Sequence, residues 1–263
     1  MNFTHAIARA PSARFANGLT TAGLGPPDVS LAVRQHEAYV SALAACGVAV
    51  TVLPPVPGFP DAVFVEDTAV ITARAAIIAN PGAPTRNGEA LLMRAELAAR
   101  FSHLETIRPP GTLDGGDVLQ VGDCFFVGVS ARTNANGARQ FIDAVTALGY
   151  RAVAVPLTAM LHLKTGVAWL GDDVLLVTGE LADHDAFAGF DRIMVPDVEA
   201  YAANSLRING TVLMPEGFPR TAAAAARRGY PVHTLDMSEF RKMDGGLSCL
   251  SLRFCGNNNC KSD

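Results

Sequence analysis

The chain has 263 residues, of which 49% are hydrophobic and 17% are charged, and its formal net charge is −4. This composition is typical of a globular protein large enough to bury a substantial core. The acidic balance argues against a surface that binds nucleic acid or anionic membranes. No apolar run approaches the roughly 20 residues of a membrane span, and residues 1–11 lack the apolar core of a signal peptide. We therefore expect a cytoplasmic protein.

The cysteines and histidines indicate the redox compartment of the protein and whether it binds a metal. The five cysteines are an odd number, which fits a reducing compartment. There is no C-x-x-C or H-E-x-x-H pattern, and the six histidines show no ligand spacing. The chain also lacks a glycine loop of the type that binds phosphate. We expect neither a metal nor another cofactor.

The predicted elements begin with an N-terminal strand at residues 3–9. Asp28 is a candidate N-cap for a helix that ends at Gly47, and a strand follows at residues 48–53.

Four hairpins of short apolar strands come next, and Asn209-Gly210 is the strongest of their turn signals. The hairpin strands are 68–72 with 75–79, 118–121 with 124–127, 167–170 with 174–177, and 206–208 with 211–214.

Each hairpin precedes a helical pattern and one more strand. The helices are expected at residues 88–101, 135–148, 182–190 (the weakest pattern) and 219–228, and the strands at 104–107, 152–155, 193–195 and 231–235.

The unit strand, strand, helix, strand therefore recurs about every 40 to 50 residues, which is typical of a propeller. The first strand of the fifth unit, residues 249–254, would pair with residues 3–9 and close the ring. The sequence predicts an α/β fold, a five-bladed propeller of ββαβ units. Residues 1–254 would form one domain, and the polar residues 255–263 a disordered tail.

Ionisable residues lie in the loops that precede these hairpins. If the units are related by rotation, the loops meet at one end of the axis and bring Asp67, Asp114, His162 and Cys249 together. A thiolate is a strong nucleophile, a histidine can transfer protons, and carboxylates can hold a guanidinium group. Taken singly, each residue has a structural explanation: a core histidine, turn aspartates and a buried strand cysteine. Their joint occurrence favours a catalytic pocket.

Six motifs resemble those of one enzyme family. They are F-x-E-D at 64–67, L-D-G-G-D at 113–117, S-A-R-T-N at 130–134, H-L-K-T at 162–165, A-A-N at 202–204 and D-G-G-L-S-C at 244–249. The set resembles the dimethylarginine dimethylaminohydrolases, which belong to the guanidine-modifying (pentein) superfamily of five-bladed α/β propellers. The resemblance covers nearly the whole chain.

The resemblance implies a role for each matching residue in the reaction. Cys249 would be the nucleophile and His162 the general acid and base. Asp114, at the position where the family has an acidic partner, would belong to the catalytic set and, together with Asp67, would clamp the guanidinium nitrogens. Glu66 would be a supporting residue nearby.

Other matching residues would hold the amino-acid end of the substrate. Asp61 would bind the α-amino group, and Arg86 and Arg132 would bind the α-carboxylate. Leu19 would belong to a lid over the pocket.

The predicted function is hydrolysis of Nω-methylated L-arginine to L-citrulline and dimethylamine or methylamine through a thiouronium on Cys249. One alternative is an arginine deiminase or amidinotransferase of the same superfamily. Another is a non-catalytic propeller that binds partners. We expect a small-molecule substrate, no nucleic-acid or membrane partner, and a monomer or homodimer.

Overall fold

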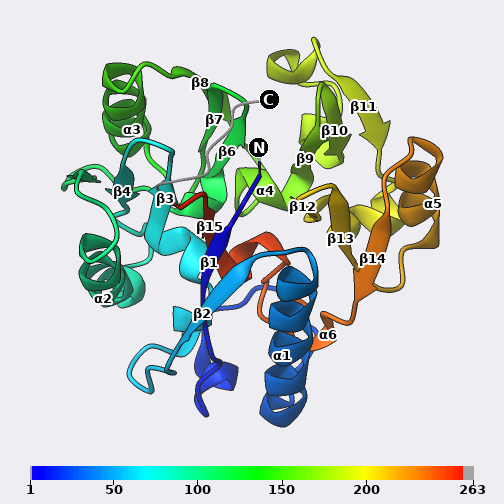
Figure 1. The fold of residues 1–263 in the computed structure, drawn as a ribbon, viewed down its shortest axis with the longest axis horizontal. Coiled ribbons are helices and arrows are strands. Elements are labelled where there is room, and N and C mark those ends of the chain that lie inside the picture. Colours follow the sequence, from blue (N-terminus) through cyan, green and yellow to red (C-terminus); the bar gives the residue numbers. More distant parts are fainter. Residues whose placement is uncertain (1, 257–263) are drawn as a thin grey trace.

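The computed structural model describes residues 2–256. Five three-stranded sheets surround a central axis, and helices cover the outside of the ring (Figure 1). Among the described residues, no helix has the length and apolar character needed to cross a bilayer. The expected α/β propeller of five units is confirmed.

In four of the five units, the sheet consists of an antiparallel hairpin and a parallel third strand that follows a crossover. The first unit contains β3 (Ala69–Ile71), β4 (Ala76–Ile78), the crossover helix α2 (Asn87–Ala98) and β5 (Leu104–Thr106). The second contains β6 (Val118–Val121), β7 (Cys124–Val129), α3 (Ala135–Ala147) and β8 (Arg151–Pro156). The third contains β9 (Val167–Gly171), β10 (Val174–Val177) and β11 (Asp191–Met194). The fourth contains β12 (Leu206–Ile208), β13 (Thr211–Pro215), α5 (Pro219–Arg227) and β14 (Val232–Leu235).

The fifth sheet joins the two ends of the chain. Strand β15 (Ser251–Phe254) pairs antiparallel with β1 (His5–Arg9), with Ala8 opposite Ser251. Strand β1 also pairs in parallel with β2 (Ala49–Leu53), which follows α1 (Val29–Ala45). The predicted closure by the N-terminal strand is therefore confirmed. Pairing of the two chain ends leaves no open gap between the first and last units of the ring.

Local sequence signals explain how these elements begin and end. The Asp28 side chain accepts hydrogen bonds from the amides of Ser30 and Leu31 and caps α1. The turn between β12 and β13 has positive φ at Asn209 (46°) and Gly210 (96°), as a two-residue hairpin turn of the primed kind requires. The side chain of Asn209 also binds the backbone of Phe3, so this turn holds the start of the chain.

Two expected elements differ in the structure. Residues 182–190 do not form an α-helix, because the chain makes separate 3-10 turns at Gly179–Leu181 and Asp185–Phe187. The His184 ring accepts a hydrogen bond from the Ala186 amide and caps the second turn. The last inner strand begins at Ser251 and not at Cys249, because Ser248–Leu250 form a 3-10 turn. The expected disordered tail falls largely on residues 257–263, outside the described residues.

Candidate active site

Short helical turns precede the innermost strands and meet at one end of the axis. These turns are Val65–Thr68, Gly115–Asp117, α4 (Leu163–Gly166), Asp197–Ala203 and Ser248–Leu250. Contacts join Val65–Thr68 to Gly115–Asp117 and to Ser248–Leu250, and α4 to Gly115–Asp117 and Asp197–Ala203. The amide of Ser248 also donates to the Asn204 side chain, 3.0 Å away. The expected convergence of these loops is therefore seen in the structure.

A pocket opens at this end of the propeller. It is lined by seven of the nine site residues expected from the sequence, which are Leu19, Asp61, Asp67, Arg86, Arg132, His162 and Cys249. Asp114 lies behind this lining, and Glu66 lies outside it.

Cys249 lies in the middle of the Ser248–Leu250 turn and is only 9% exposed. Its Sγ accepts a hydrogen bond from the amide of Gly246 at 3.4 Å. A Cβ on Gly246 would lie 2.4 Å from the Asn204 side chain, so only glycine lets this loop approach so closely. Burial, with the charges of Glu66 and Asp67, raises the pKa of the Cys249 thiol to about 12. The sulfur is therefore a thiol in the free protein.

His162 precedes α4, and its ring is held from behind by Asp114. The His162 Nε2 lies 3.0 Å from Oδ2 of Asp114, which is 0% exposed. The other carboxylate oxygen accepts from the amide of Gly82 at 2.7 Å. Since Nε2 is engaged by Asp114, Nδ1 is the nitrogen left to exchange a proton in the pocket.

Negative charge around the ring decides the charge of His162. Burial alone would lower the pKa of this imidazole, but the charge of Asp67, the hydrogen bond that the ring donates to Asp114 and the charge of Asp117 raise it to about 9. A Cβ on Gly116 would lie 2.8 Å from both Asp67 Oδ1 and His162 Nδ1. The absence of that Cβ allows the carboxylate and the ring to approach each other. His162 is thus a cation at neutral pH and can act as an acid.

Asp67 belongs to a buried ion cluster with Arg86 and Glu89. Arg86 Nη1 lies 2.6 Å from Asp67 Oδ2, and Arg86 Nη2 lies 2.8 Å from Glu89 Oε2. Burial opposes the charge of Asp67, but the charges of His162 and Arg86 lower its pKa to about 2. Arg86 also donates to the carbonyls of Asp61 and Phe64. All three guanidinium nitrogens are therefore engaged within the protein, which fits a role in holding Asp67.

Arg132 is the more available of the two arginines. Its side chain is 22% exposed, and its Nη1 lies 4.0 Å from Oδ2 of Asp114. The guanidinium therefore reaches the pocket without a close ion pair. Of the two residues expected to bind a carboxylate, Arg132 is the one whose guanidinium makes no hydrogen bond within the part of the chain that the structure describes.

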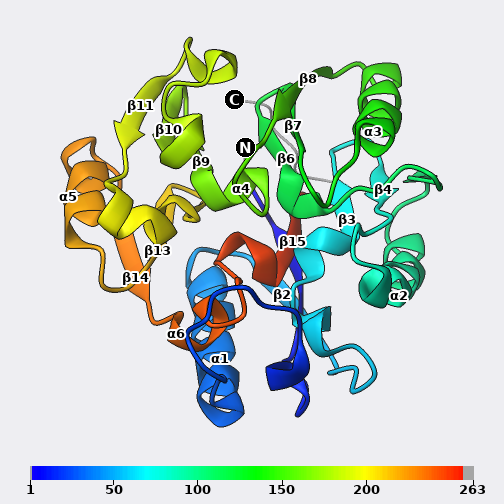
Figure 2. The same cartoon turned by 180° about the vertical axis from the view of Figure 1, so that it is seen from behind.

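The loop at Gly18–Gly25 covers the pocket. Leu19 is 41% exposed, and its amide donates to both carboxylate oxygens of Asp61 at 3.1 and 3.2 Å. The amide and hydroxyl of Thr21 donate to Oδ2 of Asp244. Figure 2 shows the dark blue loop crossing in front of the red segment that carries Cys249. The position of Leu19 fits the expected lid.

Two residues have positions that differ from the expected roles. Asp114 was expected to clamp the guanidinium, but it contacts His162 and does not line the pocket. Glu66 was expected near the substrate, but its carboxylate faces the opposite side of the turn, toward Lys164 and Arg253. Consecutive residues of a tight turn point in different directions, which is why Asp67 lines the pocket and Glu66 does not.

Sequence reasoning missed three carboxylates around the pocket. Glu89 pairs with Arg86, Asp117 accepts from the Leu163 amide at 2.9 Å, and Asp244 holds the lid. The i, i+3 spacing of Arg86 and Glu89 was a readable signal for the first pair. Asp117 and Asp244 belong to the motifs at 113–117 and 244–249, but sequence reasoning gave roles there only to Asp114 and Cys249.

One group of side chains has the geometry of a metal site. Asp67, Asp114 and His162 offer ligand atoms within 4.8 Å of one another. A protonated His162 between two carboxylates accounts for the same arrangement, because opposite charges attract. That no metal takes part stays a prediction.

A five-bladed α/β propeller with a cysteine, a histidine and carboxylates at one end of its axis defines the class of guanidine-modifying enzymes. The chain matches the family model described as arginine deiminase over residues 30–194. It is 48% identical over 254 residues to an N(G),N(G)-dimethylarginine dimethylaminohydrolase of Pseudomonas aeruginosa, covering 96% of this chain and 100% of that protein. The chain belongs to the dimethylarginine dimethylaminohydrolase family.

Solved structures agree with this assignment. A mutant of the Pseudomonas aeruginosa enzyme, complexed with citrulline, superposes with a TM-score of 0.95 at 46% identity, covering 97% of this chain and 100% of that one. A second dimethylarginine dimethylaminohydrolase, in an adduct with S-methyl-L-thiocitrulline, gives a TM-score of 0.94 at 47% identity, covering 96% and 100%.

Proposed function

We propose that this protein hydrolyses Nω-methylated L-arginine to L-citrulline and dimethylamine or methylamine. The observation that carries the proposal is a buried cysteine and a cationic histidine in one pocket with the carboxylates Asp61 and Asp67. Family membership and the citrulline complex of a relative point the same way.

Substrate binding follows from the charges that face the pocket. The guanidinium group would lie against Asp67, and the α-amino group would reach Asp61, whose carboxylate also holds the lid amide. The α-carboxylate would bind Arg132, while Arg86 keeps Asp67 in place. Asp114 would orient His162 from behind.

The first chemical step forms a covalent intermediate. The guanidinium cation beside Cys249 favours the thiolate, because an opposite charge lowers a thiol pKa. The thiol proton passes to solvent, and the sulfur forms a bond to the guanidinium carbon. His162 gives its proton to the substituted nitrogen, the carbon–nitrogen bond breaks, and the amine leaves a thiouronium on Cys249.

The second step uses the same histidine in its neutral form. His162 takes a proton from water as the water oxygen attacks the thiouronium carbon. Collapse of this adduct breaks the carbon–sulfur bond and returns the thiolate of Cys249. The oxygen that came from water then loses its remaining proton to solvent and becomes the carbonyl oxygen of the ureido group of citrulline.

A parallel assay of four substrates tests the proposal. Citrulline formation is measured with asymmetric dimethylarginine, monomethylarginine and arginine, and N-carbamoylputrescine formation with agmatine, which lacks the carboxylate. The methylated substrates should have the highest kcat/KM, and agmatine should be poor. An arginine deiminase is the second candidate, because the matching family model carries that description. Faster turnover of arginine than of either methylated substrate would select it.

Intact-protein mass spectrometry tests the order of the two steps. His162→Gly mixed with dimethylarginine and quenched with acid should accumulate an adduct of substrate mass minus dimethylamine, since hydrolysis has lost its base. Cys249→Ser should show no such adduct. An inactive His162→Gly without an adduct would assign His162 to the first step alone.

The same proposal includes the setting of the enzyme. Cys46, Cys124, Cys249 and Cys255 are free thiols, which fits a cytoplasmic protein. We propose one catalytic domain over residues 1–254 that acts as a monomer or homodimer without a cofactor. Light scattering coupled to size exclusion distinguishes the two assemblies, and a larger oligomer would contradict both.

A further inference from the structure

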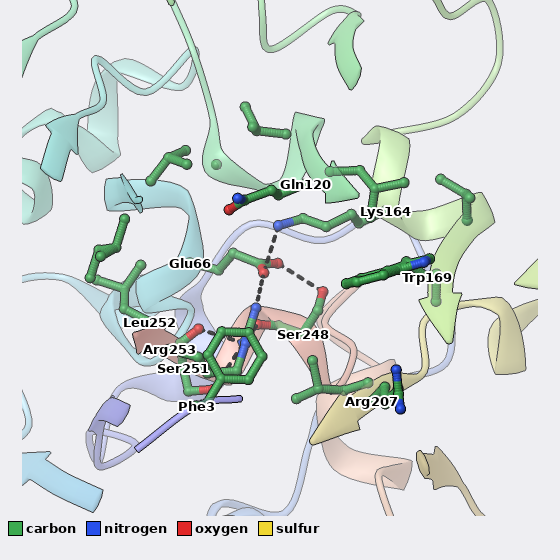
Figure 3. Close-up of a pocket in the computed structure, with 18 of the residues that line it drawn as sticks. Phe3, Glu66, Gln120, Lys164, Trp169, Arg207, Ser248, Ser251, Leu252 and Arg253 are labelled. Atoms are coloured by element: carbon green, nitrogen blue, oxygen red, sulfur yellow. Dashed lines mark hydrogen bonds and ion pairs between the residues drawn. The ribbon is translucent and has the colours of Figure 1, made fainter. Parts of the chain in front are cut away.

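A second cavity lies inside the ring and is separate from the pocket at Cys249. Its volume is about 140 Å³. Its walls come from the innermost strand of every sheet, namely β3, β6, β9, β12 and β15. It is therefore an axial channel, and Figure 3 shows the side chains that line it.

The floor of this channel is a charged cluster centred on Glu66. Lys164 Nζ lies 2.7 Å and Arg253 Nη2 lies 2.9 Å from the same oxygen of Glu66. The hydroxyl of Ser248 donates to the other oxygen at 2.8 Å. Figure 3 shows Lys164 and Arg253 reaching Glu66 from opposite sides. Lys164, Arg253 and Ser248 therefore all donate to the carboxylate of Glu66.

Positive charge exceeds negative charge in the channel. Among the described residues, its lining contains the cations Lys164, Arg207 and Arg253 and a single carboxylate, Glu66. The Nε of Arg207 is buried and has no hydrogen-bond partner among the described residues. Buried polar groups are normally satisfied, so this donor is available to a partner beyond the described residues. The pocket at Cys249 differs in this respect, because its lining contains the carboxylates Asp61, Asp67 and Asp244 as well as cations.

We propose that the channel binds a small oxyanion of the phosphate or carboxylate class, and that occupancy slows catalysis without blocking the substrate pocket. Guanidinium and ammonium donors are the groups that hold such anions. Gln120 and Ser205 also line the channel, and in this structure they donate to the carbonyls of Gly122 and Ala202. A cationic substrate would be repelled there.

Chain connectivity links this site to the reacting groups. Glu66 directly precedes Asp67, Ser248 directly precedes Cys249, and Lys164 stands in the helix that follows His162. If an oxyanion binds Lys164 or Arg253 in place of Glu66, the buried Glu66 carboxylate loses part of the positive charge that neutralises it. Uncompensated negative charge behind Cys249 opposes formation of the thiolate. The expected effect is a lower kcat with little change in KM.

The chain provides its own reporter for binding. Trp169 is the only tryptophan, and it lines the channel. Titration with inorganic phosphate, and separately with succinate, at constant ionic strength should give a saturable change in tryptophan fluorescence. Comparison of the two probes distinguishes a phosphate site from a carboxylate site. This readout does not require catalysis, whereas the kinetic effect rests on the proposed function.

Two variants and one control make the test specific. Arg207→Gln removes a cation that does not touch Glu66, and Gln120→Glu adds a negative charge to the wall. Each should weaken anion binding by about tenfold or more, as expected for loss of a charge-assisted contact. Arg34→Gln, on the exposed face of α1, should bind as the parent does. Circular dichroism verifies that all three variants fold.

The kinetic measurement uses the same anions. Phosphate or succinate should lower kcat several-fold in the parent and in Arg34→Gln, with half-saturation equal to that of the fluorescence change. Arg207→Gln and Gln120→Glu should resist this inhibition. Absence of saturable fluorescence, or binding unchanged in both channel variants, would overturn the proposal. Purely competitive inhibition would place the anion at Arg132 in the substrate pocket instead.

Discussion

Replacing Asp114 with asparagine tests whether His162 is a cation in the resting enzyme. Asparagine has nearly the same shape, and its carbonyl oxygen can still accept the Gly82 amide that now binds Oδ1 of Asp114. The substitution removes the negative charge that lies 3.0 Å from His162 Nε2. It therefore changes the electrostatics of the ring with little change in packing.

The size of the effect follows from the pKa of His162. A rise from 6.5 to about 9 corresponds to about 3.4 kcal/mol, at 1.36 kcal/mol for each pH unit. Asp67, Asp114 and Asp117 share this stabilisation. Loss of one of the three should lower the pKa of His162 by roughly one pH unit, equivalent to about 1.4 kcal/mol.

The same shift affects stability. The folded pKa of His162 lies above its unfolded value, so its contribution to stability is complete below pH 6.5 and is lost as the pH rises through about 9. Because the unfolded pKa is the same in both proteins, Asp114→Asn should reduce the free energy of unfolding by about 1.4 kcal/mol at any pH below about 8. Above pH 9 the parent and the variant should differ less.

Two measurements decide the outcome. An NMR titration of the His162 ring gives its pKa directly, and the basic limb of kcat/KM against pH should move down with it. Asp123→Asn, in the exposed turn between β6 and β7, is the matched control and should leave both unchanged. A His162 pKa that stays near 9 in Asp114→Asn would refute the electrostatic argument.

Three further predictions concern other parts of the site. Cys249→Ser should lose citrulline formation by several orders of magnitude, whereas Cys124→Ser should stay active; the reverse result would reject the nucleophile. Arg132→Ala should mainly raise KM, with a loss of about 1.5–3 kcal/mol in the free energy of substrate binding. Arg86→Ala should lower Tm and kcat, because breaking a buried ion pair costs about 3–5 kcal/mol of stability. Equal effects of these two arginine variants on KM, with Tm unchanged, would contradict the division of roles. Gly116→Ala places a Cβ 2.8 Å from a carboxylate oxygen and from the histidine ring, so kcat should fall by about 10²-fold; a parental kcat would show that this approach is not needed.

The sequence determined the repeating elements, because their signals act within a few residues. Asn209-Gly210 needs only its own backbone angles to form a hairpin turn, and the Asp28 cap binds amides two and three residues away. Regular recurrence of such signals was sufficient to predict five units and their closure. The helix expected at residues 182–190 failed because a short side-chain cap at His184 favours a 3-10 turn there.

The tertiary structure decided which way the polar side chains point. Glu66 and Asp67 are neighbours in the sequence, yet Asp67 faces the substrate pocket and Glu66 faces the axial channel. The partner that holds Glu66 is Ser248, 182 residues away along the chain. A local pattern cannot encode such a pairing, because it exists only when the ring closes and brings the first and last inner strands together. For the same reason, only the folded ring shows that Asp114 lies behind His162.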